Sequence, residues 1–232
     1  ASFLVFCDGK SYQPMVYSQD HKPIGEGDKG PNTGGMGTYS PAPILEGYEE
    51  ELDERVMQPF LQGAKKEGID YRGVLYVGLM KTKDGIKILE FNCRFGDPET
   101  QVILPRLKND LLDVFEAVVD QRLDQVKLNW SGKHCMCVVA ASEGYPGAYE
   151  KGEVISGVEK AQALPHTHII HAGTKVENGK LKTNGGRVLN VVALGDTLKD
   201  AAKNAYDGIG LVEFKGMYFR KDIGSKEMDR NK

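Results

Sequence analysis

The sequence lacks the features that mark membrane, secreted or nucleic-acid-binding proteins. No apolar run among the 232 residues approaches the ~20 residues that a membrane-spanning helix needs. No basic start followed by an apolar core indicates a secretory leader. The formal net charge is only −3, so no excess of positive charge favours a polyanion such as DNA. We therefore expect neither a nucleic-acid partner nor a membrane partner.

Cysteine is scarce, and its spacing does not match the common zinc or redox motifs. The four cysteines are Cys7, Cys93, Cys135 and Cys137. None of them forms a C-x-x-C pair, and no cysteine or carboxylate completes a zinc pattern beside the H-T-H sequence at residues 166–168. Because free cysteine is among the most buried residue types, we predict buried free thiols and a reducing, cytoplasmic compartment.

The first half of the chain predicts a sheet with helices. SFLVFC and SYQPMVYS read as two strands joined by a turn at Asp8-Gly9. Leu52, Val56 and Phe60 recur at helical spacing, which predicts a helix over residues 46–67 that ends before a glycine. GVLYVGLM and IKILEFN flank the turn KTKDG and predict an antiparallel hairpin, followed by helices over residues 100–107 and 109–123.

The second half has a different character. LDQVKLNWSGK resembles a linker, and the segments CMCVVAAS, GEVISG, THIIH and GGRVLNVVALG read as strands. VENGKL is a hairpin turn, and residues 197–208 read as the one helix of this half. The fold class predicted is therefore α+β, with an antiparallel sheet and helices in residues 1–125 and a small, mostly β domain in residues 126–232.

The strand end in ILEFNCRFGDPETQ groups a carboxylate, an amide and a guanidinium. Glu90, Asn92 and Arg94 fall at alternate positions, and alternate side chains share one face of a strand. Carboxylate and amide oxygens suit Mg²⁺, which shares its remaining positions with phosphates and water. An arginine just beyond would suit phosphate or an anionic transition state. A solvated ion pair between Glu90 and Arg94 explains the same pattern equally well.

Two glycine-rich segments are further candidates for ligand binding. GPNTGGMG, at residues 30–37, offers backbone N–H groups with no side chains in the way, although it is neither a nucleoside-triphosphate loop nor a dinucleotide fingerprint. Asp20-His21-Lys22 precedes it. TNGGRVL places Arg187 after two glycines at a strand entry, where it would clamp a phosphate or lie in a surface hairpin.

Taken together, these segments resemble one enzyme family closely. SQDHK, GPNTGGMG-x-YSPAP, EFNCRFGDPETQ, GYPG-x-Y-x-KG, HAGT and TNGGRVL are similar to the C-terminal half of the glycinamide ribonucleotide synthetases, which are ATP-grasp ligases of purine synthesis. The resemblance runs from Ser2 to about Ile223. It implies the C-terminal subdomain of an ATP-grasp fold followed by a small β-rich domain. It also implies that ATP, glycine and 5-phosphoribosylamine give glycinamide ribonucleotide, ADP and phosphate through a glycyl phosphate.

The resemblance also implies roles for individual residues. Glu90 and Asn92 would hold Mg²⁺ or Mn²⁺ together with ATP, and Arg94 would lie against the reacting carboxylate or acyl phosphate. Asp20 and Lys22 would also be catalytic, and with His21 they would line the substrate side. The positions implied to bind substrate are Asn32, Thr33, Gly34, Gly35, Met36, Gly37, Asp97, Pro98 and Arg187.

Two departures from the general ATP-grasp pattern accompany the resemblance, and the first does not weaken it. GVLYVGLM carries no additional metal-binding carboxylate, although ATP-grasp enzymes commonly have one there. The nucleotide-holding N-terminal half has no counterpart, so we expect a fragment whose partner is the remainder of the same enzyme. An isolated module that binds Mg²⁺ or phosphate without turnover is the alternative. A related ATP-grasp carboxylase fits GPNTGGMG and EFNCRFGDPETQ less well.

Overall fold

The computed structural model describes residues 1–230, and the chain forms two compact units. Unit 1 comprises Ala1–Gln19, Pro41–Gly96 and Ile103–Ser131, and unit 2 comprises Asp20–Ser40, Asp97–Val102 and the chain from Gly132 onward. The units are thus interleaved along the sequence, whereas the sequence analysis places a single boundary after residue 125. The difference arises because the glycine-rich segment at residues 30–37 and the turn at Asp97 both contact later strands of the chain.

Unit 1 is built on an antiparallel sheet with the strand order β2-β1-β7-β8. Its strands are β1 (Ser2–Cys7), β2 (Tyr12–Pro14), β7 (Gly73–Thr82) and β8 (Gly85–Asn92). Both predicted hairpins are confirmed, because β1 pairs with β2 and β7 pairs with β8. The strand β2 is only three residues long, shorter than the predicted run.

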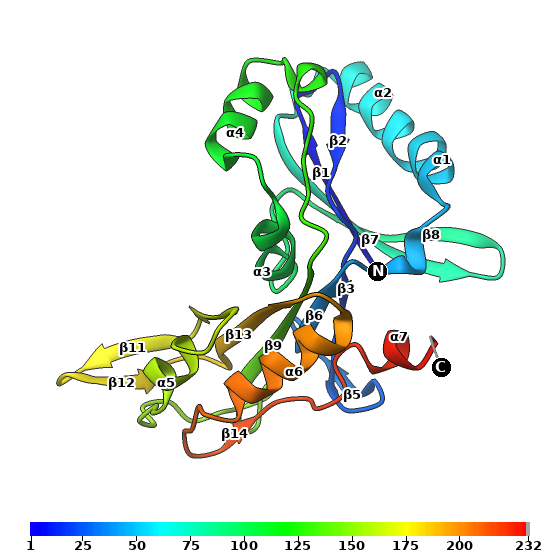
Figure 1. Cartoon of the computed structure of the whole chain (residues 1–232). Coiled ribbons are helices and arrows are strands. Elements are labelled where there is room, and N and C mark those ends of the chain that lie inside the picture. Colours follow the sequence, from blue (N-terminus) through cyan, green and yellow to red (C-terminus); the bar gives the residue numbers. More distant parts are fainter. Residues whose placement is uncertain (231–232) are drawn as a thin grey trace. The chain divides into compact units, whose positions relative to one another are not determined.

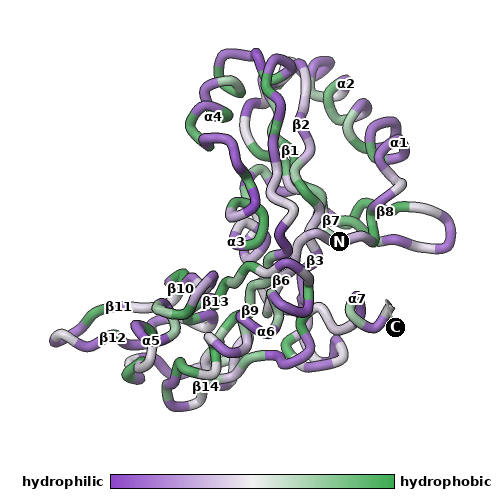
Figure 2. Tube along the Cα trace, viewed as in Figure 1, coloured by the Kyte–Doolittle hydropathy of each residue, from purple (hydrophilic) through white to green (hydrophobic). Residues whose placement is uncertain are grey.

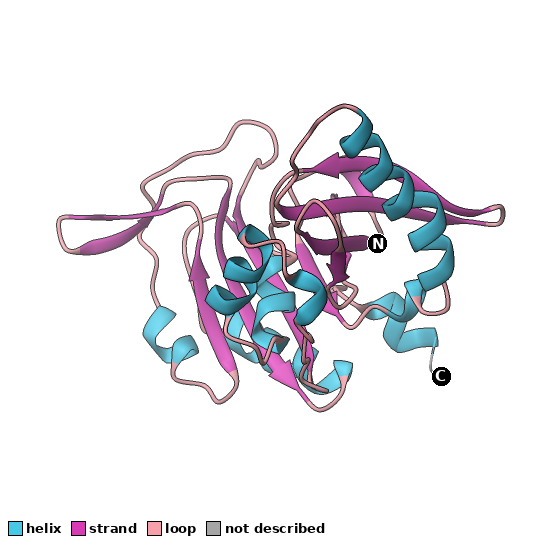
Figure 3. Cartoon of the chain, turned by 90° about the horizontal axis from the view of Figure 1, so that it is seen from above, coloured by secondary structure: helices cyan, strands magenta, loops and turns pink. Residues whose placement is uncertain are grey.

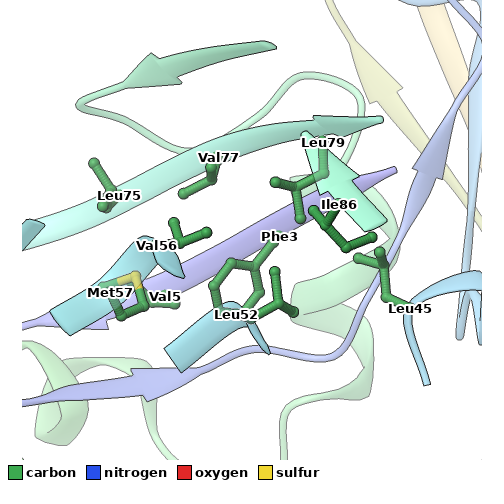
Figure 4. Packing of buried hydrophobic residues seen from close by; sticks show 10 residues of the cluster. All are labelled: Phe3, Val5, Leu45, Leu52, Val56, Met57, Leu75, Val77, Leu79 and Ile86. Carbon is green, nitrogen blue, oxygen red and sulfur yellow. The ribbon is translucent and has the colours of Figure 1, made fainter. Parts of the chain in front are cut away.

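A helical segment covers one face of this sheet (Figure 3). It consists of α1 (Glu49–Leu52), a π-helical turn η2 (Asp53–Met57) and α2 (Gln58–Lys66), and it follows a 3₁₀ turn η1 (Pro43–Leu45). Gly68, with a φ of 68°, ends the predicted helix in the left-handed conformation that glycine tolerates. The apolar face of the helix packs against the sheet (Figure 4), and the cluster comprises Phe3, Val5, Leu45, Leu52, Val56, Met57, Leu75, Val77, Leu79 and Ile86.

The two helices predicted after the hairpin are also present in shortened form. They are α3 (Thr100–Ile103), continued by a 3₁₀ turn η3 (Leu104–Arg106), and α4 (Leu111–Val119), followed by η4 (Leu123–Gln125). Asp110 caps α4, since its side chain accepts a hydrogen bond from Leu112 N at 2.8 Å.

Unit 2 contains a six-stranded sheet in which β10-β13-β9-β6-β3 are neighbours and β14 also pairs with β9. These strands are β3 (Gln19–Asp20), β6 (Gly37–Ser40), β9 (His134–Ser142), β10 (Thr167–His171), β13 (Arg187–Gly195) and β14 (Met217–Tyr218). The central strands β9 and β13 carry apolar residues (Figure 2), and α6 (Leu198–Ile209) packs on them (Figure 1). A capping box at Thr197 and Asp200 begins α6.

Several details of unit 2 differ from expectation. The start of the glycine-rich segment at residues 30–37 pairs with the chain before it, in a hairpin of β4 (Pro23–Gly25) and β5 (Lys29–Asn32) that was not predicted. Two short helices, α5 (Val158–Gln162) and α7 (Ser225–Arg230), accompany the single predicted one. The predicted Asn-Gly turn does join β11 (Thr174–Glu177) to β12 (Lys180–Thr183).

The cysteines are free, and the expectation that they are buried holds for three of the four. Cys7, Cys135 and Cys137 are buried, whereas Cys93 is exposed, because it lies just past the end of β8. Among residues 1–230, no helix is long and apolar enough to cross a membrane.

Candidate functional site

Glu90 lies on β8 in unit 1, exposed and with no ion pair anywhere in the described chain. The antiparallel register sets Glu90 opposite Gly78. A Cβ atom on Gly78 would come within 2.9 Å of the Glu90 Cγ atom, so glycine leaves room for this side chain on the neighbouring strand. The carboxylate is therefore accessible to a ligand.

Asn92 and Arg94 are linked to each other rather than to Glu90. The strand ends at Asn92, so strand alternation does not set the position of Arg94 as predicted. Arg94 Nη2 instead donates to Asn92 Oδ1 at 3.4 Å, and Arg94 Nη1 donates to Phe95 O at 2.8 Å. The alternative ion pair between Glu90 and Arg94 is absent from the described residues.

The glycine-rich segment lies in unit 2, where its backbone pairs with the segment just before it. Thr33 N and Thr33 Oγ1 both donate to Lys22 O at 2.8 Å, and Gly35 N donates to Thr33 Oγ1 at 2.9 Å. Met36 N donates to His21 O at 2.9 Å. These amides are engaged within the protein, which differs from the expectation of free N–H groups, and the loop is held by its own hydrogen bonds.

Asp20 is a buried carboxylate behind this loop. Its side chain is 3% exposed, and Oδ2 lies 2.9 Å from Lys22 Nζ. Oδ1 accepts hydrogen bonds from His21 N at 2.7 Å and from Thr38 Oγ1 at 3.4 Å. Burial, and then the negative charge of Glu99, raise the pKa of Asp20 to about 6. The group is thus able to hold or release a proton near neutral pH.

Gly35 is required by the close packing around Asp20. Its φ is +121°, a conformation that other residues rarely adopt. A Cβ atom there would lie 2.5 Å from Pro98 Cδ and 2.7 Å from Asp20 Oδ1. The structure therefore brings Asp20, Gly35 and Pro98 together, as three of the predicted site positions.

Arg187 binds the loop itself. Its Nη1 atom donates to Gly34 O at 3.0 Å, to Gly35 O at 3.4 Å and to Asp97 O at 2.9 Å. Its Nη2 atom pairs with Asp97 Oδ2 at 3.0 Å. The guanidinium thus joins the predicted positions Gly34, Gly35 and Asp97, which all belong to unit 2, and most of its donors are already used.

Sequence reasoning missed how His21 anchors this region. His21 is buried, its Nε2 atom accepts from Gly224 N at 3.3 Å, and its Nδ1 atom lies 3.1 Å from Gly37 O. Since Nε2 accepts, the proton is on Nδ1, which donates to Gly37 O. Burial, and then the nearby Arg220 charge, lower the pKa of His21 to about 4, so the ring is neutral.

Arg220 was also missed, and no local pattern marks it. Its side chain is 1% exposed and pairs with Asp222 at 2.7 Å and Asp28 at 3.0 Å. It also donates to Pro23 O at 3.0 Å. Arg220 therefore fixes the β4–β5 hairpin, which leads into the glycine-rich loop, to the segment after β14.

The described residues contain no cluster of three or more His, Cys, Asp or Glu side chains that would bind a metal alone. Glu90 and Asn92 supply two hard oxygen ligands on one strand. That donor set fits Mg²⁺, which typically takes one or two protein oxygens and shares the rest with phosphates and water. The side chains of unit 1 thus offer a donor set that suits a metal and phosphate, whereas the loop amides of unit 2 are already hydrogen-bonded within the protein.

Comparisons with known proteins agree along nearly the whole chain. Residues 1–100 match the family model described as phosphoribosylglycinamide synthetase, ATP-grasp (A) domain, and residues 135–226 match the C domain of the same synthetase. A phosphoribosylamine–glycine ligase from Synechocystis sp. is 50% identical over 98% of this chain and 55% of its own length. The chain spans about half the length of the curated relatives it matches.

Solved structures support the same fold. The crystal structure of a phosphoribosylamine–glycine ligase from Thermotoga maritima has a TM-score of 0.81 and 36% identity, and it matches over 96% of this chain and 55% of its own. The biotin carboxylase domain of a thermophilic 2-oxoglutarate carboxylase, with a TM-score of 0.61 and 13% identity, covers 94% of this chain and 47% of its own. At that identity the second likeness concerns the fold alone, which is the predicted ATP-grasp type.

Proposed function

Because the chain belongs to the phosphoribosylglycinamide synthetase family, we propose that it forms the metal-binding half of an ATP-dependent carbon–nitrogen ligase. The reaction joins glycine to 5-phosphoribosylamine and gives glycinamide ribonucleotide, ADP and phosphate. The carboxylate of glycine is first phosphorylated, and the amine of phosphoribosylamine then displaces phosphate from the glycyl phosphate. Such chemistry needs positioned groups and charge stabilisation more than covalent catalysis by the protein.

The exposed, unpaired carboxylate of Glu90 is the observation that carries this proposal. Glu90 and Asn92 would hold Mg²⁺ or Mn²⁺ together with the phosphates of ATP. The metal would neutralise phosphate charge when bound. Exposed glutamates are common on protein surfaces, so the support comes from Glu90 being accessible beside a second hard oxygen ligand, Asn92, on the same strand.

Arg94 in unit 1 would act on the phosphoryl group, and Asp20 and Lys22 in unit 2 are the further proposed catalytic positions. The guanidinium of Arg94 would stabilise the phosphoryl group and the acyl phosphate, because its planar donors match their oxygens. Lys22 is 2.9 Å from Asp20 and its side chain is 40% exposed, so its ammonium group is accessible from solvent to an anionic substrate. The raised pKa of Asp20 supports a role in holding a proton close to the reacting amine.

The loop Asn32–Gly37, with Asp97 and Pro98, would line the substrate side. Arg187 donates to the carbonyls of Gly34 and Gly35 and pairs with Asp97. It would therefore serve mainly by holding the loop, and only secondarily by direct contact with substrate.

The test is ADP release by the full-length enzyme that contains this chain. We expect release that depends on ATP, on both glycine and 5-phosphoribosylamine, and on Mg²⁺ or Mn²⁺, with loss on chelation. Glycine-independent ADP release, or none at all, would overturn the ligase assignment.

The same assay on the 232-residue chain alone distinguishes half of a ligase from a module that works by itself. We expect it to fold and to release no ADP, because its partner would be the nucleotide-binding remainder of the same enzyme. Turnover by this chain alone would mean that it binds ATP without that remainder.

A further inference from the structure

The motif GYPG-x-Y-x-KG has no role in the reaction proposed above, yet one of its side chains reaches the substrate loop. It follows β9, and the hydroxyl oxygen of Tyr145 accepts a hydrogen bond from Gly34 N at 3.0 Å. Tyr145 and Gly34 are separated by 111 residues and both belong to unit 2. The contact therefore joins the C-terminal part of the unit to the loop Asn32–Gly37.

Gly34 is thereby held on both sides of its backbone. Arg187 Nη1 donates to Gly34 O at 3.0 Å, while Tyr145 accepts from Gly34 N. Gly34 is exposed, so water would satisfy both groups without any protein partner. Ordering a tyrosine and an arginine there costs side-chain entropy, and the net gain of each hydrogen bond is small. What the two contacts provide is a fixed position for this peptide.

The ring of Tyr145 packs against a backbone segment that is itself held by hydrogen bonds. A Cβ atom on Gly186 would lie 2.1 Å from Tyr145 Cδ2, so the ring packs directly on the backbone of the TNGGR segment. Ser142 at the end of β9 fixes that segment, since Ser142 N donates to Gly186 O at 2.8 Å and Ser142 Oγ donates to Gly185 O at 2.9 Å. The phenol thus has little freedom to follow the loop if the loop moves.

We propose that Tyr145 is a positioning residue for the substrate loop, and that with Arg187 it clamps the Gly34 peptide in the geometry that binds substrate. The clamp links two motifs, GYPG and TNGGR, and gives the first of them a role in the site. The part of the proposal that concerns substrate rests on the proposed function of the loop, whereas the clamp itself does not.

Tyr145→Phe isolates the clamp, because it keeps the ring on Gly186 and removes only the hydroxyl group. Tyr149→Phe is the matched control. It lies in the same segment, with its ring 6.2 Å from that of Tyr145, and its hydroxyl makes no hydrogen bond in the described chain.

The first measurement is amide hydrogen exchange at Gly34 in the 232-residue chain. We expect Tyr145→Phe to accelerate exchange roughly 3- to 10-fold, in line with loss of one hydrogen bond, and Tyr149→Phe to leave it unchanged. Unchanged exchange in Tyr145→Phe would overturn the clamp, whatever reaction the enzyme catalyses.

The second measurement is steady-state kinetics of the full-length enzyme. We expect Tyr145→Phe to raise the KM for glycine or phosphoribosylamine roughly 3- to 10-fold, with the melting temperature and kcat nearly unchanged. Faster exchange with an unaltered KM and kcat would mean that the clamp is only structural, which overturns the positioning role. Wild-type enzyme that releases no ADP with glycine would overturn the proposed function, and Gly34 exchange would still decide whether Tyr145 holds the loop.

Discussion

The predicted site residues of the loop Asn32–Gly37 in unit 2 and of the strand end Glu90–Arg94 in unit 1 differ in how far their polar groups are hydrogen-bonded. Around the loop, the amides of Thr33, Gly34 and Gly35 are all hydrogen-bonded within the protein. At the strand end, Glu90 is exposed and has no ion pair within residues 1–230, where Arg94 donates to Phe95 O and, at 3.4 Å, to Asn92 Oδ1. The loop is preorganised by the chain itself, whereas the strand end has groups left over for ligands.

This contrast indicates how each region should respond to substitution. Removing a ligand-binding group from an exposed strand end removes few internal contacts, so it should reduce activity and leave stability unchanged. Adding atoms inside the packed loop should reduce both, because the neighbouring side chains leave no space for them. The substitutions below separate these two responses.

Glu90→Gln should have the largest effect on activity. It preserves shape but removes the charge that would bind the metal, so we expect kcat/KM of the full-length enzyme to fall roughly 1000-fold. The melting temperature should change by no more than about 2 °C. Glu54→Gln, at an exposed position in the same unit, is the control and should retain full activity. Wild-type turnover by Glu90→Gln would remove this residue from the metal site.

Gly35→Ala should be the most damaging change to stability. The new Cβ atom would meet Pro98 Cδ at 2.5 Å and Asp20 Oδ1 at 2.7 Å, at a φ of +121°. We expect the free energy of unfolding to fall by about 2–4 kcal/mol, measured by urea denaturation of the 232-residue chain.

Gly63→Ala is the opposite control for Gly35→Ala. It lies in α2 with nothing within 4 Å of the added methyl group. Alanine is the better helix former, so we expect a gain of about 0.5–1 kcal/mol. Equal stability of the two variants would show that the loop is not tightly packed.

His21→Gln should reduce the acid sensitivity of folding. The pKa of His21 is about 4 in the folded chain, against an ordinary value of 6.5. Between these values the unfolded chain binds a proton that the folded chain does not, so this contribution to stability is lost as the pH falls. Between pH 7 and 4.5 we expect the wild type to lose roughly 2–3 kcal/mol more stability than the variant.

Urea unfolding at both pH values measures this difference. The raised pKa of Asp20 acts in the opposite direction, since the folded chain then holds a proton that the unfolded chain releases. The contribution of Asp20 is the same in the wild type and in His21→Gln, so it cancels when their stabilities are compared. His168→Gln, at an exposed position, should behave as wild type. An identical pH dependence in His21→Gln would contradict the buried, neutral ring.

Arg94→Lys should have the smallest of these effects, although a clear one. Lysine keeps the charge but not the planar pair of donors, so we expect kcat/KM to fall about 30-fold with little change in stability. Arg55→Lys, an exposed helical position, is the control. A loss of less than about tenfold would argue against a bidentate contact between Arg94 and phosphate.

The sequence by itself determined the features that depend on local periodicity. The apolar run of β7, its return in β8, the helical spacing of Leu52 and Val56, and the Asn-Gly turn were all readable, because short apolar runs between turn residues mark strands and a 3.6-residue repeat marks a helix. The alternation of side chains along a strand placed Glu90 and Asn92 together, and the glycine-rich motifs were sufficient for the resemblance to the family.

Only the tertiary structure decided which distant groups meet. Arg187 reaches Gly34 across 153 residues, and Gly224 reaches His21 across 203. The exposed position of Cys93 and the interleaving of the two units were likewise not readable. Sequence patterns report the period and the buried face of each element, but partner choice between elements depends on how the whole unit packs, which no short segment encodes.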